Sequence, residues 1–204
     1  MAISVPYLSD HVLRHAAEEF LAAHHPSRKI PVPIEAIVEF QLRIDIIPIP
    51  GIHRAYDIDS MLSSDMQQIC VDQAVFEDFP GRYRFSLAHE VGHLQLHAGI
   101  YSQLTFSDIA EWKNVICDKV GEKDYGKLEF QAYAFAGLIL VPPSFLGERF
   151  RATIALAESK GLTVKTDSDV ARDAVESYLS REFVVSRDVI RRRLAYDKLW
   201  ETLS

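Results

Sequence analysis

The sequence predicts an α+β protein in which helices predominate and a short β-sheet completes the core. Two observations predict this class. Apolar residues recur at helical spacing in residues 10–24, around residue 90, in residues 127–140 and in most of the chain after residue 144. Two short segments, Ile44–Ile49 and Gln68–Val71, have instead the composition of β-strands.

Composition restricts the class of protein further. The 204 residues are 48% hydrophobic and 25% charged, which is typical of a globular domain with a real core. The net charge of -7 argues against nucleic acid as the main partner. Cys70 and Cys117 form no C-x-x-C pattern and are expected to be buried thiols in a reducing compartment. No apolar run resembles a signal peptide or a membrane span, so we expect a cytoplasmic protein without a membrane partner.

The N-terminal elements follow in order. Ser9 is expected to cap a helix over residues 10–24. The strand at Ile44–Ile49 ends at a Pro-Gly pair, and the polar segment from His53 to Asp65 is expected to be a loop. The strand at Gln68–Val71 is a candidate free edge on which an extended peptide substrate pairs.

The apolar segment around residue 90 contains the pattern His-Glu-x-x-His. A turn at residues 79–81 is expected to precede this helix, with Ser86 as its N-cap. Residues four apart share a helix face, so His89 and His93 can bind one metal ion. Glu90 is then placed to take the proton of a water at that metal. The alternative is a pair of structural histidines, but buried polar groups without partners cost roughly 1–3 kcal/mol each, and a metal supplies the partner.

The third metal ligand distinguishes two classes of zinc peptidase. The metzincin pattern requires glycine at position 96 and histidine at position 99, whereas the chain has Leu96 and Gly99. A glutamate on a later helix remains. Glu129 is favoured over Glu111 and Glu122, because it lies in an apolar helix where a lone carboxylate needs a cation. Small residues in that helix would let another helix approach closely: Ala132, Ala134, Ala136 and Gly137.

The chain divides into a predicted core of residues 1–143 and a helical C-terminal region of residues 144–204. Within the latter, residues 179–194 have the layout of a helix-turn-helix with a basic second helix. Its arginines suit phosphate contacts, but Val184 occupies the position where such turns usually have glycine. We therefore favour a helical appendage that packs on the core or holds a protein substrate over a DNA-binding module.

Two blocks of sequence, residues 84–97 and 129–142, resemble the ImmA/IrrE family of metallo-endopeptidases in their order and separation. The resemblance implies a small zincin-like core with a short sheet. It implies that His89, His93 and Glu129 bind Zn²⁺ and that Glu90 is the general base. It further implies that the substrate is a helix-turn-helix transcriptional repressor, whose cleavage regulates gene expression.

One position departs from a common zincin pattern. Four residues after the glutamate ligand, where Asp or Asn often supports the first histidine, the chain has Tyr133. The partner of His89 is therefore open, with Asp118 and Asp124 as candidates.

The group that stabilises the reaction's oxyanion is also open. The sequence offers Tyr83, Tyr101, Tyr133 and His97, and does not choose between them. His97, one turn after His93, is a candidate for orienting a ligand or meeting substrate, although a structural role is favoured.

The function expected is that of a zinc metallo-endopeptidase. The alternative is a zinc-containing regulatory protein that binds a repressor, or DNA through its C-terminal helices, without cutting anything, because the same ligands would serve both.

Overall fold

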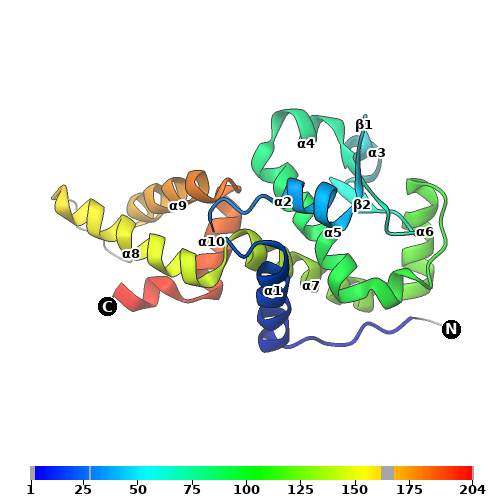
Figure 1. The fold of residues 1–204 in the computed structure, drawn as a ribbon, viewed down its shortest axis with the longest axis horizontal. Helices are drawn as coiled ribbons and strands as arrows, with labels where there is room; N and C mark the ends of the chain where they lie inside the picture. Colours follow the sequence, from blue (N-terminus) through cyan, green and yellow to red (C-terminus); the bar gives the residue numbers. More distant parts are fainter. Residues whose placement is uncertain (1–2, 28, 162–167, 204) are drawn as a thin grey trace.

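The computed structural model describes residues 3–27, 29–161 and 168–203, apart from the side chain of Cys117. Helices predominate around one three-stranded sheet, which confirms the predicted α+β class. The sheet and α6 lie towards one end of the molecule, α8 and α9 towards the other, and α1 and α7 between them (Figure 1).

The sheet has the strand order β1-β3-β2. Strand β3 (Gln68–Asp72) lies in the centre, parallel to β1 (Asp45–Ile49) and antiparallel to β2 (Ser60–Leu62). The prediction of a free edge at Gln68–Val71 is therefore wrong, because both sides of β3 are already hydrogen-bonded. Cys70 in this strand is half-buried rather than buried.

The segment from His53 to Asp65 is also not the loop that its polar composition predicts. It contains most of helix α3 (Ile52–Tyr56) and the whole of β2. Both elements are too short to show a periodic pattern, and β2 exists only because β3 supplies its hydrogen bonds. Strand formation here is decided by partners that lie seven to eleven residues further along the chain.

The first helix, α1 (Asp10–His24), has the predicted bounds, and Ser9 caps it by accepting a hydrogen bond from the amide of Val12. Short helical segments flank the strands in the chain. Two precede β1: α2 (Ile34–Ala36) and the π-helical segment η1 (Ile37–Leu42). A third, α4 (Gln73–Asp78), follows β3.

The motif helix α5 runs from Pro80 to Tyr101. It begins well before the predicted N-cap, so Ser86 is an internal, buried residue and residues 79–81 are not a separate turn. Proline suits the first position of a helix, because its missing N–H would have no partner there. Helix α5 packs on β2, β3 and α7 and forms the centre of the molecule.

The remaining helices are α6 (Ile109–Val120), α7 (Glu122–Leu140), α8 (Pro143–Ser159), α9 (Asp169–Phe183), α10 (Arg187–Tyr196) and a final 3-10 turn, η2 (Leu199–Leu203). Residues on both sides of position 143 belong to one hydrophobic cluster, which includes Val91 and Phe135 from the predicted core and Phe150 and Leu179 from the C-terminal region. The two regions share this core, and the proposed division at residue 143 stays a prediction.

Helices α5 and α7 touch backbone to backbone at Gly92. A Cβ atom at this position would lie 2.9 Å from the carbonyl oxygen of Ala132 and 3.0 Å from its Cα. Such distances leave no room for a side chain, since neither contact is with a flexible group. Glycine here, opposite alanine, allows the closest approach of the two helices.

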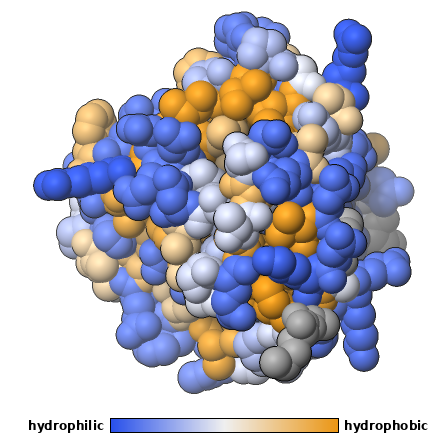
Figure 2. Space-filling model, turned by 90° about the vertical axis from the view of Figure 1, so that its right-hand side faces the viewer, coloured by the Kyte–Doolittle hydropathy of each residue, from blue (hydrophilic) through white to orange (hydrophobic). Residues whose placement is uncertain are grey.

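Apolar residues also reach the surface. On the face seen in Figure 2 they lie in separate groups between hydrophilic side chains. Within the described ranges no single helix has the length and apolar character to cross a membrane; α7 and α8 together pass that test but are bent by 58° at their junction.

The contact at Gly92 predicts that Gly92→Ala destabilises the protein. The added methyl must displace the backbone of α7, which costs about 1–3 kcal/mol for overpacking. The matched control is Gly99→Ala in the same helix, where nothing lies within 4 Å and the higher helix propensity of alanine applies. Urea unfolding of both variants measures the difference. A Gly92→Ala variant as stable as Gly99→Ala would contradict the proposed close contact.

Candidate metal centre

Three side chains from α5 and α7 converge on one point. The Nε2 atoms of His89 and His93 are 3.0 Å apart, and the carboxylate of Glu129 lies 3.2 Å from the first and 3.4 Å from the second. Among the described residues, this is the one group of His, Cys, Asp and Glu side chains placed to hold a metal ion. The structure thus brings together the three residues that the sequence selected.

The donor set fits zinc. Two imidazole nitrogens and a carboxylate oxygen, with room for a fourth ligand, are the ligands of an open catalytic zinc site. Bonds of about 2.0–2.1 Å in a tetrahedron place neighbouring ligand atoms about 3.3–3.4 Å apart. The three separations within the group are close to that spacing, so little movement is needed to bind the ion.

The electrostatics of the site follow from this crowding. Burial disfavours the charged form of both partners, yet the Glu129 contact still raises the pKa of His89. In the same way the two histidines outweigh burial and hold the pKa of Glu129 well below its usual range. The imidazoles and the carboxylate thus stabilise opposite charges at this point, which is also where a cation would be favoured.

A chain of hydrogen bonds behind His93 selects its tautomer. The Nε2 group of Gln131 donates to the carbonyl of Pro6 over 2.8 Å, so its Oε1 is left to accept from Nε2 of His97, also over 2.8 Å. Burial lowers the pKa of His97 to about 4, which keeps this ring neutral with Nδ1 as an acceptor. Nδ1 of His93 lies 3.2 Å away and must donate.

The consequence is that Nε2 is the ring nitrogen of His93 left with a lone pair for a metal ion, as a metal ligand requires. His97 is thus a buried supporting residue that contacts His93, and it does not line the cavity in front of the ligands.

Glu90 points to the other side of the cleft. It is only 3% exposed, and its Oε1 accepts a hydrogen bond of 2.6 Å from the hydroxyl of Ser60, the first residue of β2. One carboxylate oxygen is therefore held in place by the sheet. Because the sequence placed Ser60 in a loop, this contact could not be foreseen.

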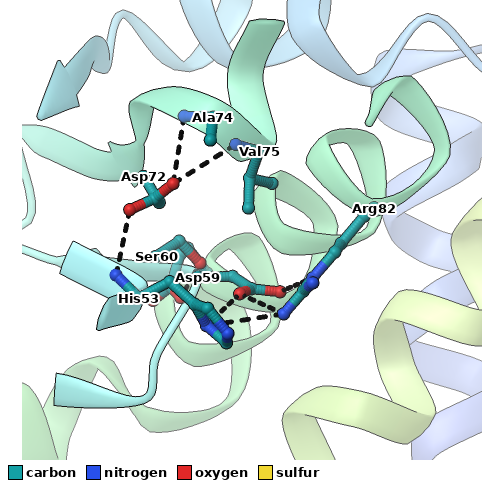
Figure 3. A network of polar contacts seen from close by, with 8 residues as sticks. His53, Asp59, Ser60, Asp72, Ala74, Val75 and Arg82 are labelled. Atoms are coloured by element: carbon teal, nitrogen blue, oxygen red, sulfur yellow. Dashed lines mark hydrogen bonds and ion pairs between the residues drawn. The ribbon is translucent and has the colours of Figure 1, made fainter. Parts of the chain in front are cut away.

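A polar network forms the rim of the cleft opposite α7 (Figure 3). Arg82 binds both carboxylate oxygens of Asp59, and Nδ1 of His53 lies 3.1 Å from the same carboxylate. The backbone of His53 is itself anchored, because its amide donates to Asp72 over 2.9 Å. The carboxylate of Asp72 also accepts from the first amides of α4, and so ties α3 to that helix.

These groups enclose a cavity of about 380 Å³ that contains the three metal ligands and Glu90. His53, Asp59 and Arg82 line it, and sequence analysis assigned no role to any of them. No signal in the sequence identified them, since their positions depend on how α3 and β2 fold against α5.

The tyrosines proposed for the site separate into two groups. Tyr101 and Tyr133 line the cavity, and the ring of Tyr133 packs on Phe85 with the centroids 4.6 Å apart. Tyr83 does not reach it: its hydroxyl donates to Glu35 over 3.0 Å, and burial together with this carboxylate raises its pKa.

Neither of the carboxylates suggested as partners of His89 meets that role. Asp124 pairs with Lys127 at 2.6 Å, and neither it nor Asp118 lines the cavity.

Comparison with known proteins agrees with this geometry. The sequence model of the M78 peptidases, described as the IrrE N-terminal-like domain, matches residues 68–195. The chain belongs to this family. The resemblance inferred from the two sequence blocks is thereby confirmed, and membership of the M78 family supports a function of the metallopeptidase kind.

A solved structure, described as a Mycobacterium tuberculosis transcriptional regulator, has a similar fold with a TM-score of 0.51 and 18% sequence identity. The similarity covers 93% of this M78 chain and 47% of the regulator, so the chain spans about half the length of that protein. A search of the curated proteins found no match.

The hydrogen-bond chain behind His93 predicts an effect at a distance from the metal. Gln131→Leu leaves the buried His97 without an acceptor and frees the His93 tautomer, which should weaken Zn²⁺ binding about 10- to 100-fold. Competition with a chromogenic chelator measures the affinity. Gln95→Leu, an exposed change on α5, is the control. Equal affinities for the two variants would show that the chain does not orient His93.

Proposed function

We propose that the protein is a zinc-dependent endopeptidase that cleaves a helix-turn-helix transcriptional repressor and so regulates gene expression. The observation that carries this proposal is the placement of Glu90 in the same cavity as the converging ligand atoms of His89, His93 and Glu129. A purely structural zinc site would have four protein ligands and no acid or base beside them.

The reaction is hydrolysis of a peptide bond. A zinc ion held by the three ligands would supply Lewis acidity towards water and the scissile carbonyl. Glu90 accepts a proton as water adds to the carbonyl carbon and delivers it to the leaving nitrogen as the C–N bond breaks. The hydroxyl of Ser60 holds one oxygen of Glu90 throughout. Tyr101, Tyr133 and His53 line the cavity and are the donors available to the developing oxyanion.

The choice of a repressor as substrate rests on the family resemblance. What supports a protein substrate more generally is that the cavity opens on one side to the polar rim of His53 and Arg82, and on the other to α7 and α10. A peptide can therefore cross the ligands from one wall to the other.

The C-terminal helices favour this reading over DNA binding. All four arginines of the basic helix are engaged within the chain: Arg187 with Asp173, Arg191 and Arg192 with Asp188, and the buried Arg193 with Asp197. Phosphate contacts would have to compete with these carboxylates. The turn before α10 is made by Val184 in the left-handed region, with φ 51°.

Replacing the proposed base tests the mechanism. Glu90→Gln preserves an acceptor for Ser60 and leaves the metal ligands untouched, so Zn²⁺ binding should persist. Loss of the proton acceptor should lower the cleavage rate by about 10²–10⁴-fold. The measurement combines zinc titration with mass spectrometry of a proteome-derived peptide library and of a helix-turn-helix repressor encoded nearby. Glu158→Gln, an exposed change on α8, is the control.

The outcomes distinguish the peptidase activity, the choice of substrate and the role of Glu90. Cleavage of peptides but not of the repressor would retain the peptidase and reject this substrate. No cleavage of either by the zinc-loaded protein would favour the regulatory protein that binds without cutting. Wild-type rates in Glu90→Gln would reject Glu90 as the base.

A further inference from the structure

A second cavity, of about 400 Å³, lies beside the metal centre between α7 and α10. It shares Phe85, His89, Glu129 and Tyr133 with the cavity that contains Glu90. The two cavities therefore border the same side chains, two of them proposed metal ligands, and a group bound in the second cavity lies next to those ligands.

The walls of this second cavity are two facing helical stripes. From α7 come Phe130, Tyr133, Ala134 and Gly137. From α10 come Val189, Arg192, Arg193 and Tyr196. Each set has the spacing i, i+3, i+4, i+7, which places its members on one face of a helix. At Gly137 the two stripes pack together, because a Cβ there would lie 3.1 Å from Cδ of Arg193. The small side chain of Ala134 contributes less bulk to the wall of the cavity.

The lining is apolar although two arginines contribute to it. The guanidinium of Arg192 bonds to Asp188 at 2.7 Å and lies over the Tyr133 ring, 5.3 Å from its centroid. The guanidinium of Arg193 is directed to Asp197 at 2.6 Å. Both charges are thus compensated by carboxylates on the C-terminal side of the cavity, and the long side chains also carry aliphatic stems. An acidic ligand would have to compete with Asp188 and Asp197 for these cations.

Aromatic groups stand at the edge of the cavity. Phe130 is 58% exposed and Tyr196 is 38% exposed, both large for residues of this type on a folded surface. An apolar group that enters the cavity would cover part of them.

We propose that this second cavity is the specificity pocket of the peptidase and receives a large apolar side chain, such as Leu, Met or Phe, next to the scissile bond. This inference rests on the proposed function, since a substrate peptide must cross the metal ligands. Because His89 and Glu129 line both cavities, the pocket lies beside the proposed metal ligands. The C-terminal helix α10 would then contribute to substrate recognition rather than to DNA binding.

Binding measured without turnover tests the pocket. Three peptide hydroxamates with one backbone, whose single variable side chain is methyl, isobutyl or benzyl, are titrated into the zinc-loaded protein by calorimetry. The hydroxamate anchors each at the metal and places the side chain next to it. We expect the isobutyl and benzyl compounds to bind about 10- to 100-fold more tightly than the methyl compound, as burial of a large apolar side chain predicts.

Ala134→Phe fills the pocket from α7. It should abolish this preference, so that the three compounds bind with similar affinities. The control Ala155→Phe adds the same ring to an exposed site on α8 and should keep the preference. Circular dichroism and zinc titration verify that both variants fold and bind metal. A second variant, Val189→Trp, fills the pocket from α10 and should act in the same way.

Equal affinities of the wild-type protein for the three compounds, including no binding at all, would overturn the proposal. An unchanged preference in the folded Ala134→Phe variant would also overturn it. A wild-type dimer that this substitution converts to a monomer would assign the pocket to a second copy of the chain instead. A preference in binding without any cleavage of peptides would keep the pocket and reject the peptidase.

Discussion

The contact between α5 and α7 at Gly92 is the constraint on which the metal centre depends. Gly92 lies between the two histidine ligands, and Ala132, which it touches, lies one turn after Glu129. The carboxylate reaches both imidazoles because the two backbones are in contact at this point. A side chain at residue 92 would separate the helices, and the ligand atoms would move apart with them. Close packing of the two helices is therefore a condition for bringing the three proposed ligands together.

The two helices also determine what surrounds the ligands. Behind them, Gln131 and His97 connect His93 to the N-terminal segment at Pro6, so a residue far from the motif helps to select the tautomer of a ligand. In front, β2 brings Ser60 to Glu90, and α3 brings His53 to the rim. The proposed base and the proposed metal ligands are thus held by different elements around one cavity.

The C-terminal helices join this arrangement through α10. Its arginines are neutralised by carboxylates of the same helical region, and the stem of Arg193 packs close to Gly137 of α7. Burial lowers the pKa of Arg193 to about 10, so the residue stays charged at neutral pH. Its ion pair with Asp197 stabilises the end of α10. The arginines of α10 therefore help to pack this helix beside its neighbours.

The ligand pair, the base and the long helices were determined by the sequence itself, because spacing along a helix is a local property and α1 and α5 need no distant partner to be recognised. Glu129 was inferred from its apolar setting, and the distances to His89 and His93 agree with it. Tertiary structure alone decided the rest. Strand β2 depends on hydrogen bonds from β3, which made the predicted free edge wrong and turned an expected loop into a wall of the cleft. The cavity is also lined by Ser60, His53 and Arg82, whereas Tyr83 does not reach it. Contacts of this kind join residues far apart in the chain. They follow from how the helices and the sheet pack, and no periodic pattern in the sequence predicts them.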